Sequence, residues 1–393
     1  MTERSKVVPF TVRHPNPARM AEFAETARRL EHERAVSDDI VSSALRGTPR
    51  EAWATLRERR ELHTSGALER LGQEIDKRLD TDPREALAIA ELAASVADAL
   101  APDSYPAIIL AQLRAHAWRD RGQALSYLGR YDDALRALDR AEEQFQKFGT
   151  LGHDRAIVRF CRATLLQHLR RFDEARAILD ECRQVFQSYA DTQSYVKCTL
   201  AIGNLLVRAG DYRAAREMLS PLAREDSPIA PIAQMGLGWC AVNLGTAEEA
   251  IEHFDAAGRG YRRLGRDLET VRAAYGAGSA MLRLQRFSDA IEKLRSVRAT
   301  FLSRGLVEEA GLSGLGIVEA QLVLGNAPAA RDLAASLVQE FTAASLNRRA
   351  VAALAYLNDA MAASSATPEI VRDVHSYIFS LRTDPLREFL CAN

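Results

Sequence analysis

The sequence predicts an all-α fold, a right-handed α-solenoid of antiparallel helix pairs, on three observations. First, a pattern of small and large apolar residues recurs six times at intervals of about 40 residues. Second, large apolar residues fall at positions i, i+3, i+4 and i+7, which places them on one face of an α-helix. Third, acidic residues open several of the predicted helices, where they complement the positive end of the helix dipole. Because stacked helix pairs bury their apolar faces against neighbours, a chain of 393 residues can form one extended array.

The pattern is clearest in the copy that begins at Trp118. An aromatic, a small and a large apolar residue mark its first helix, a glycine marks the turn, and a similar set marks the second helix. Its members are Trp118, Gly122, Leu125, Gly129, Tyr131, Ala134, Leu138 and Ala141. This pattern resembles the tetratricopeptide repeat (TPR), in which two helices form each unit. The second helices of the six copies open at Tyr131, Phe172, Tyr212, Ala247, Phe287 and Ala327.

The copies are 41, 40, 35, 40 and 40 residues apart, whereas the usual TPR spacing is about 34 residues. The longer spacing predicts helices extended by about a turn and a half. In this respect the chain is similar to long-helix TPR proteins of bacterial regulation, such as the Rap-type phosphatases and peptide-sensing transcription factors. The resemblance covers residues 65–385 and implies a binding role, since TPR proteins share a fold but not one activity.

The segment before the repeats is predicted to have two parts. Residues 1–17 are polar and proline-containing and are expected to be disordered. Residues 18–64 are expected to form a helical cap or a docking element, with helices at 19–34, 37–45 and 49–63. The last two have the outline of a DNA-binding helix-turn-helix, in which Arg50, Arg57 and Arg60 could contact a partner. Glutamates alternate with these arginines, which favours a cap or a docking element over DNA binding.

Residues 65–382 are predicted to form the solenoid, with about eight helix pairs that include degenerate ends. The leading pair spans 65–101, where Asp82, Pro83 and Glu85 form the signature of a helix start. The closing pair is expected at 348–364 and 368–381. Terminal repeats are often atypical because one face meets water. Residues 383–393 are expected to be a partly ordered tail.

Composition limits the class of partner and the compartment. The formal net charge is −1, whereas nucleic-acid binders usually carry a basic excess. The five cysteines, Cys161, Cys182, Cys198, Cys240 and Cys391, include no CxxC pair and suggest reduced thiols. No stretch approaches a membrane span, and the first residues contain no apolar segment of a signal peptide. These observations predict a cytoplasmic protein, with neither nucleic acid nor membrane as its partner.

The sequence contains no recognisable catalytic or metal motif. It has no Gly-Lys pair for a phosphate-binding loop, no GxSxG elbow, and no two histidines spaced to share a helical face. Its paired glycines, such as Gly236 and Gly238, fall on the small positions of the repeat and predict close helix packing. We therefore expect no enzyme activity, no catalytic residues, no metal and no cofactor.

The TPR resemblance implies that the first helix of each pair lines the concave surface. By that mapping, the groove residues are Arg119, Gln123, Tyr127, Phe160, Gln167, His168, Lys197, Asn204, Arg208, Trp239, Asn243, Arg272, Tyr275 and Arg283. Arginines, aromatics and amides of this kind dominate binding hot spots. The arginines favour a protein or peptide partner with acidic or carboxylate groups. The carboxylate clamp of chaperone-binding TPRs is incomplete, because Leu200 occupies its Lys position beside Asn204.

Three functions remain open at this stage. The first is a non-catalytic adaptor or regulatory scaffold that binds a protein or peptide in the concave groove. The second is a peptide-sensing transcription regulator that uses the N-terminal helix-turn-helix. The third is a phosphatase-like regulator of a signalling protein, for which the sequence marks no residue. The oligomeric state is not indicated by the sequence.

Overall fold

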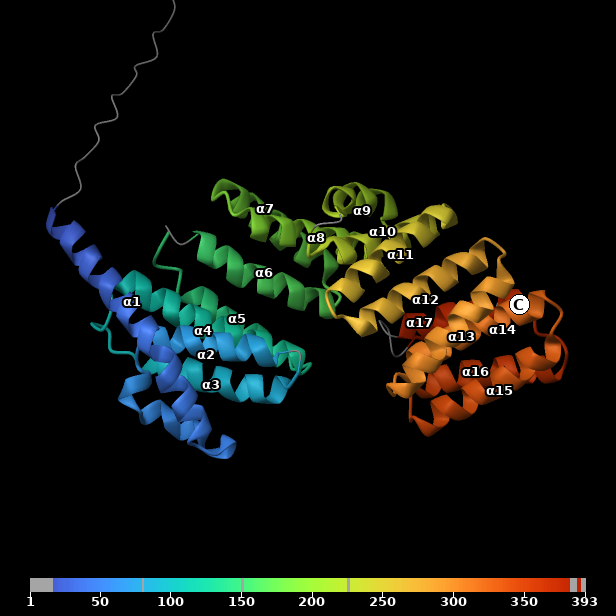
Figure 1. The fold of residues 1–393 in the computed structure, drawn as a ribbon, viewed down its shortest axis with the longest axis horizontal. Helices are drawn as coiled ribbons and strands as arrows, with labels where there is room; N and C mark the ends of the chain where they lie inside the picture. Colours follow the sequence, from blue (N-terminus) through green and yellow to red (C-terminus); the bar gives the residue numbers. More distant parts are fainter. Residues whose placement is uncertain (1–16, 80, 150–151, 225–226, 382–386, 390–393) are drawn as a thin grey trace, which may run out of the picture. The chain divides into compact units, whose positions relative to one another are not determined.

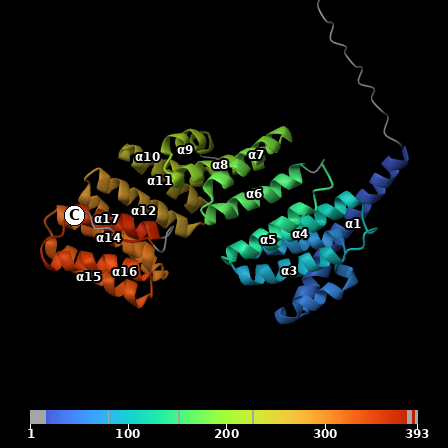
Figure 2. The same ribbon diagram turned by 180° about the vertical axis from the view of Figure 1, so that it is seen from behind.

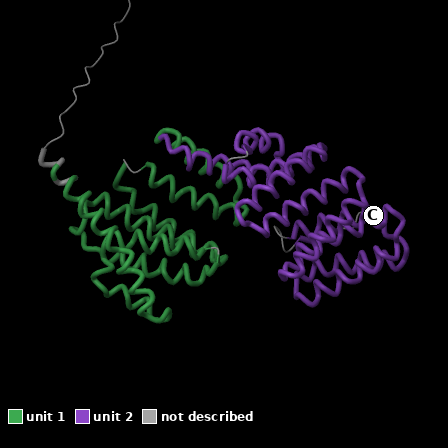
Figure 3. The backbone as a smooth tube through the Cα atoms, in the orientation of Figure 1, with its two compact units in different colours: residues 1–189 green, residues 190–393 purple. Residues whose placement is uncertain are grey.

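A computed structural model describes residues 17–79, 81–149, 152–224, 227–381 and 387–389. The chain divides into two compact units, unit 1 (residues 1–189) and unit 2 (residues 190–393), which are coloured separately in Figure 3. The segment expected to be disordered, 1–17, and the expected tail, 383–393, lie almost entirely outside the described residues, as does Cys391. The predictions for those segments therefore remain predictions.

Unit 1 is a stack of helices in which each packs mainly on its neighbours in the sequence (Figure 1). Its elements are α1 (Pro17–Arg46), the 3₁₀ helices η1 (Arg50–Glu58) and η2 (Arg60–Leu62), α2 (Ser65–Arg78), α3 (Pro83–Ala99), α4 (Ala107–Tyr127), α5 (Tyr131–Glu143), α6 (Gly152–His168) and α7 (Phe172–Ser188).

Unit 2 repeats the arrangement. Its elements are α8 (Thr192–Ala209), α9 (Tyr212–Leu219), the 3₁₀ helix η3 (Ser220–Leu222), α10 (Ala230–Leu244), α11 (Ala247–Arg263), α12 (Asp267–Arg283), α13 (Phe287–Ser303), α14 (Val307–Val323), α15 (Ala327–Ala343), α16 (Arg348–Ala362) and α17 (Pro368–Leu381). All regular structure in the described ranges is helical, and the predicted all-α solenoid of helix pairs is confirmed.

Helix length accounts for the unusual repeat spacing. Helices α11 to α15 each contain 17 residues, so two helices and their short turns add up to about 40 residues. The single 35-residue interval follows α9, which has only 8 residues and is followed by η3 with Pro221 in its first turn. Proline lacks the N–H that would continue an α-helix.

The turn inside each of the six pairs uses one backbone conformation. The residue at that position has positive φ in every copy: Gly129, Arg170, Gly210, Gly245, Gln285 and Gly325. Glycine adopts this left-handed conformation without steric cost. Arg170 and Gln285 adopt it at φ 59°, which indicates that helix packing on both sides determines the turn even where glycine is missing.

Small residues allow the two helices of a pair to approach closely. A Cβ on Gly122 would lie 3.0 Å from the Leu138 side chain, and one on Gly278 would lie 2.7 Å from that of Leu294. These are the predicted small and large positions of the repeat. Their contact confirms that the glycines serve helix packing, and Gly236 and Gly238 of α10 likewise face the Leu219 and Phe254 side chains.

The N-terminal region differs from the prediction. Helices expected at 19–34 and 37–45 are one continuous helix, α1, because neither glycine nor proline interrupts residues 35 and 36. The α-helix expected at 49–63 is wrong, since this stretch forms η1 and η2. Trp53 is buried, and its indole N–H donates to the carbonyl oxygens of Leu45 and Thr48 (3.2 and 2.9 Å), which ties η1 to the end of α1. Most of η1 packs on α3.

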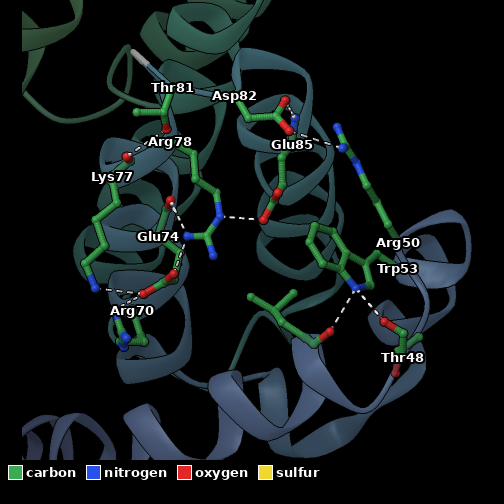
Figure 4. A network of polar contacts seen from close by, with 11 residues as sticks. Thr48, Arg50, Trp53, Arg70, Glu74, Lys77, Arg78, Thr81, Asp82 and Glu85 are labelled. Carbon is green, nitrogen blue, oxygen red and sulfur yellow. Dashed lines mark hydrogen bonds and ion pairs between the residues drawn. The ribbon is translucent and has the colours of Figure 1, made fainter.

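The start of α3 confirms the predicted N-cap and first-turn proline but not the capping box, and it adds an ion-pair network, drawn in Figure 4. Asp82 accepts a hydrogen bond from the backbone N–H of Glu85, with Pro83 in the first turn. The Glu85 side chain does not return to the cap but pairs with Arg78 at 2.5 Å. Arg78 also pairs with Glu74, so the network joins α2 to the first turn of α3.

The closing pair forms at the predicted positions but is packed in an unexpected way. Helix α16 packs on α15, whereas α17 packs on α14 as well as on α16 (Figures 1 and 2). Val371, Val374 and Ile378 of α17 are buried in one core with Leu315 and Val318 of α14. Helix α17 therefore covers part of α14, the first helix of its pair.

Candidate functional site

In unit 1 the first helices of three successive pairs, α2, α4 and α6, lie side by side, and α4 contacts both of the others. Two cavities open along α4. We call the one between α4, α5 and α6 the aromatic cavity and the one between α1, α2 and α4 the polar cavity. Their lining residues are given below.

The aromatic cavity has a volume of about 510 Å³. Tyr127 at its mouth is 49% exposed, and the rings of Tyr131 and His168 stack with centroids 5.7 Å apart and an interplanar angle of 10°. The lining residues are Gly122, Gln123, Ser126, Tyr127, Tyr131, Leu138, Phe160, Cys161, Thr164, Leu165 and His168. Such a cavity can take an apolar or aromatic group and can offer hydrogen bonds from its amide and hydroxyl groups.

The polar cavity has a similar volume, about 520 Å³. Two arginine side chains of its lining form ion pairs with carboxylates of the chain, Arg34 with Glu69 at 2.8 Å and Arg119 with Asp120 at 2.6 Å. Asp120 is only 7% exposed, and its Oδ2 atom faces Gly72 of α2. The polar lining residues are Arg34, Ser65, Glu69, Gln73, Asp76, Gln112, His116, Arg119 and Asp120.

The carboxylates near α4 have opposite electrostatic environments. Asp154 of α6 accepts a hydrogen bond from Gln112 at 3.1 Å and lies 3.5 Å from His116. His116 and Gln112 together hold the pKa of Asp154 below its usual range despite desolvation. Desolvation by the surrounding protein and repulsion from Asp120 raise the pKa of Asp76, and Arg119 only partly opposes them. The ionised form of Asp76 is thus less well compensated than that of Asp154.

The structure brings together four of the six predicted groove residues of unit 1. Gln123, Tyr127, Phe160 and His168 all line the aromatic cavity, although they come from two repeats. Arg119 lines the polar cavity. Gln167 is half-buried in α6 and is not part of the lining of either cavity.

Sequence reasoning missed Tyr131, His116 and Asp76. Tyr131 was assigned only to the repeat pattern, as the residue that opens a second helix. Asp76 lies on α2 of the degenerate leading pair, to which the groove positions were not extended. The position of Asp76 on the first helix of that pair is the sequence signal that could have identified it.

The predicted groove residues of unit 2 are placed differently. The Trp239 ring packs edge-on against Phe254 (centroids 5.1 Å apart) and lies 6.3 Å from that of Tyr275. The Tyr275 hydroxyl is 2.9 Å from His375 Nε2 of α17, and Arg272 pairs with Glu309 at 3.5 Å. Tyr275 thus contacts the chain's own last helix, and Arg272 contacts its own α14.

The remaining predicted residues of unit 2 are on α8, α10 and α12. Lys197, Arg208 and Arg283 are exposed, and Asn204 is half-buried beside Gly236 of α10. The Asn243 amide donates to the carbonyl oxygen of Trp239 in its own helix at 2.8 Å. Of the N-terminal candidates, Arg50 lies 3.4 Å from Asp82 at the start of α3, while Arg57 and Arg60 are exposed.

Metal sites and membrane-spanning helices are both absent from the described residues. These residues contain no group of three or more His, Cys, Asp and Glu side chains arranged to hold a metal ion. No helix in the described ranges is long and apolar enough to span a membrane.

Comparison with known proteins agrees with the repeat pattern. Sequence profiles of the tetratricopeptide repeat match residues 119–184 and 200–261, and another matches residues 154–220. These segments include the aromatic cavity. Residues 119–261 thus match the tetratricopeptide repeat, and the helix pairs on either side continue the same fold. Among curated protein sequences the chain has no significant match.

Several solved structures share the fold at low sequence identity. A signal transduction ATPase with a TPR sensor from Pyrococcus horikoshii has a TM-score of 0.60 and 12% identity, over 90% of this chain and 53% of that chain. This chain thus spans about half the length of that protein. The Rap conjugation gene regulator of plasmid pLS20, in complex with a Phr peptide, has a TM-score of 0.52 and 14% identity, over 71% and 73% of the two chains. Aspartyl phosphate phosphatase F from Bacillus subtilis has a TM-score of 0.51 and 13% identity, over 82% and 86%.

Proposed function

We propose that the chain is a non-catalytic regulatory scaffold that holds a protein or peptide segment against α2, α4 and α6 of unit 1. The observation that carries this proposal is the pair of cavities along α4. Each has room for a side chain or two, and the aromatic cavity exposes Tyr127 beside Phe160 and His168. Half-exposed aromatic rings around a concave site are typical of binding hot spots.

The physical argument is that a bound segment removes this aromatic surface from water and loses little side-chain entropy on the protein. Tyr131 and His168 are already stacked on each other, so part of the cavity wall is ordered before binding. Gln123 and Thr164 add hydrogen-bonding groups that can fix the orientation of a backbone. The complex of the Rap conjugation regulator with a peptide supports the same class of ligand, as an analogy of fold.

The predicted preference for acidic ligands is retained in this proposal only for unit 2. Arg119 and Arg272, two of the arginines behind that prediction, pair with Asp120 and Glu309. Lys197 and Arg208 of α8 remain exposed. A cytoplasmic location also remains part of the proposal, because the four described cysteines are free thiols.

The other two functions have less support. The helix-turn-helix alternative lacks the second α-helix that would enter a groove of DNA, because residues 50–62 form 3₁₀ helices. The phosphatase-like alternative shares its fold with one solved structure, but no feature of this chain distinguishes a glutamine or glutamate for that role.

The test is to screen a library of displayed random peptides for binding to the intact chain. We expect the retained peptides to bind the double variant Tyr127→Ala, His168→Ala at least about tenfold more weakly. The control is Tyr189→Ala, because Tyr189 is 52% exposed and is not a lining residue of either cavity, and circular dichroism should report folded protein for both. Equal binding by the double variant would place the site elsewhere, and a selection that retains no peptide would contradict the proposed function.

A further inference from the structure

We infer that the segment bound by unit 1 carries a basic group against Asp76, about three to five residues from an apolar side chain that enters the aromatic cavity. The basic group is a Lys or Arg side chain or a free amino terminus. This inference rests on the proposed function and specifies the chemistry of the ligand. It reverses, for unit 1, the acidic ligand that the groove arginines predicted.

The charges of the polar cavity carry the argument. Arg34 and Arg119 are its two arginines, and each already pairs with a carboxylate of the chain, Glu69 and Asp120. An acidic ligand would therefore compete with existing ion pairs. Asp76, by contrast, has no hydrogen bond or ion pair with any residue in the described part of the chain. It is an exposed residue that a ligand can reach, although the surrounding protein partly desolvates its carboxylate.

A cationic group of the ligand would compensate the negative charge of the Asp76 carboxylate. Desolvation and the Asp120 carboxylate raise the pKa of Asp76, which means that its neighbours stabilise the ionised form too little. A bound ammonium or guanidinium group would supply that stabilisation through a charge-assisted hydrogen bond. Apolar residues of the cavity wall, such as Leu68 and Leu113, can cover the methylene groups of a Lys or Arg side chain.

The spacing follows from helix packing. The two cavities lie on opposite sides of α4, one toward α2 and the other toward α6. Packed helices are roughly 8–10 Å apart between axes, and an extended chain advances about 3.3 Å per residue. Asp76 lies beside Arg119 and Asp120, whereas the aromatic cavity takes Gly122 to Tyr127, so the two sites are also offset along α4 by several residues at about 1.5 Å each. A segment that crosses α4 in extended form thus places its two anchoring groups about three to five residues apart.

The experiment uses the peptides retained in the selection described above. We expect them to be enriched in a basic residue, or an amino terminus, about three to five positions from a large apolar residue. One such peptide, labelled with fluorescein, should bind Asp76→Asn about two- to fivefold more weakly than the unaltered chain, as expected for loss of one partner of an exposed charge pair. Asp103→Asn is the control, because Asp103 is exposed and lines neither cavity.

A charge-exchange experiment distinguishes the loss of an ion pair from a disturbance of the fold. The variant Asp76→Lys should prefer the same peptide with its basic residue replaced by Glu over the original peptide. Retained peptides without the basic residue, or with equal affinity for Asp76→Asn, would overturn this inference and leave the proposed function in place. Absence of any retained peptide would overturn both.

Discussion

Glu74 lies at the centre of an ion-pair network that forms on the surface of α2 (Figure 4). Its carboxylate pairs with Arg70 at 2.5 Å, with Lys77 at 2.9 Å and with Arg78. The Glu74 side chain is only 12% exposed, so desolvation alone would raise its pKa. The hydrogen bonds from Lys77 and Arg78, with Arg70 beside them, outweigh desolvation and lower the pKa of Glu74 to about 2.

This pKa predicts how stability depends on pH. Because the folded pKa lies below the ordinary value of 4.5, ionised Glu74 stabilises the fold above that value, and the contribution is lost as pH falls toward 2. We expect Glu74→Gln to lower the free energy of unfolding by about 2–3 kcal/mol at pH 7. The difference between the two proteins should shrink between pH 4.5 and 2.

Urea denaturation of both proteins across this pH range is the measurement. Glu143→Gln serves as the control, since Glu143 is exposed at the end of α5 and should change stability by less than about 0.5 kcal/mol. A difference between wild type and Glu74→Gln that stays constant from pH 7 to 2 would show that the carboxylate charge is not the cause.

Single residues also show which features of the candidate site the sequence could predict and which it could not. The groove rule depends on helix periodicity, and four of the residues it selected, Gln123, Tyr127, Phe160 and His168, line one cavity. Their role in binding a partner stays a prediction. The groove rule could not reveal that Arg119 is neutralised by Asp120. Rotamers and neighbouring helices determine such pairs, so a sequence pattern cannot distinguish an arginine available to a ligand from one already paired.

At the scale of the helix, one phenylalanine determines how closely three elements of unit 2 pack. The ring of Phe254 in α11 lies between Gly238 of α10 and Gly276 of α12. A Cβ added to these glycines would lie 2.6 and 2.5 Å from the ring. Such a contact is far closer than van der Waals packing permits, so either substitution would force the ring or a helix to move.

We therefore expect Gly238→Ala to destabilise unit 2 by about 1–3 kcal/mol through overpacking, despite the better helix propensity of alanine. The matched control is Gly258→Ala in α11, because a Cβ there meets only Ala273 at an ordinary 3.8 Å. That change should stabilise the helix by about 0.5–1 kcal/mol. Thermal unfolding followed by circular dichroism measures both, and shifts of the same sign for the two variants would contradict the packing argument.

The two ends of the chain show which elements the repeat pattern could not predict. The repeat pattern predicts each helix from the contacts that it should make with its neighbours in the sequence. The helices α2 to α16 were predicted in this way. Helix α17 was predicted in its correct range, but not its packing on α14, because its buried face is apolar and fits more than one neighbour. The α-helix predicted over residues 50–62 was wrong because of tertiary structure. The indole N–H of Trp53 donates to carbonyl oxygens of α1 and of the following turn, and a repeat pattern does not reveal such contacts.

At the scale of the whole molecule, solenoid stability should be nearly local, because each helix packs mainly on its neighbours. Helix α1 is the first of the series. Besides its apolar packing and the ion pairs of Arg34 and Asp38 with α2, it is attached to the rest through Glu33. The buried Glu33 carboxylate accepts hydrogen bonds from the Ser65 N–H (3.0 Å), the Ser65 hydroxyl (2.6 Å) and the Tyr105 hydroxyl (2.6 Å). The backbone of α1 also lies so close to Gly66 that a Cβ there would overlap the Glu33 carbonyl.

This attachment makes the locality of stability testable. Glu33→Ala leaves the buried hydroxyl donors of Ser65 and Tyr105 without their acceptor, at a cost of about 3 kcal/mol, while the Ser65 N–H still donates to the Tyr105 hydroxyl at 2.9 Å. Amide hydrogen exchange should become about a hundredfold faster in residues 24–46 and moderately faster in α2, with no change in α10–α14. Glu31→Ala, an exposed position on the same helix, should leave exchange unchanged. Unaltered exchange of α1 would mean that apolar packing alone holds it, and acceleration that reaches α10–α14 would show that the repeats unfold as one cooperative body.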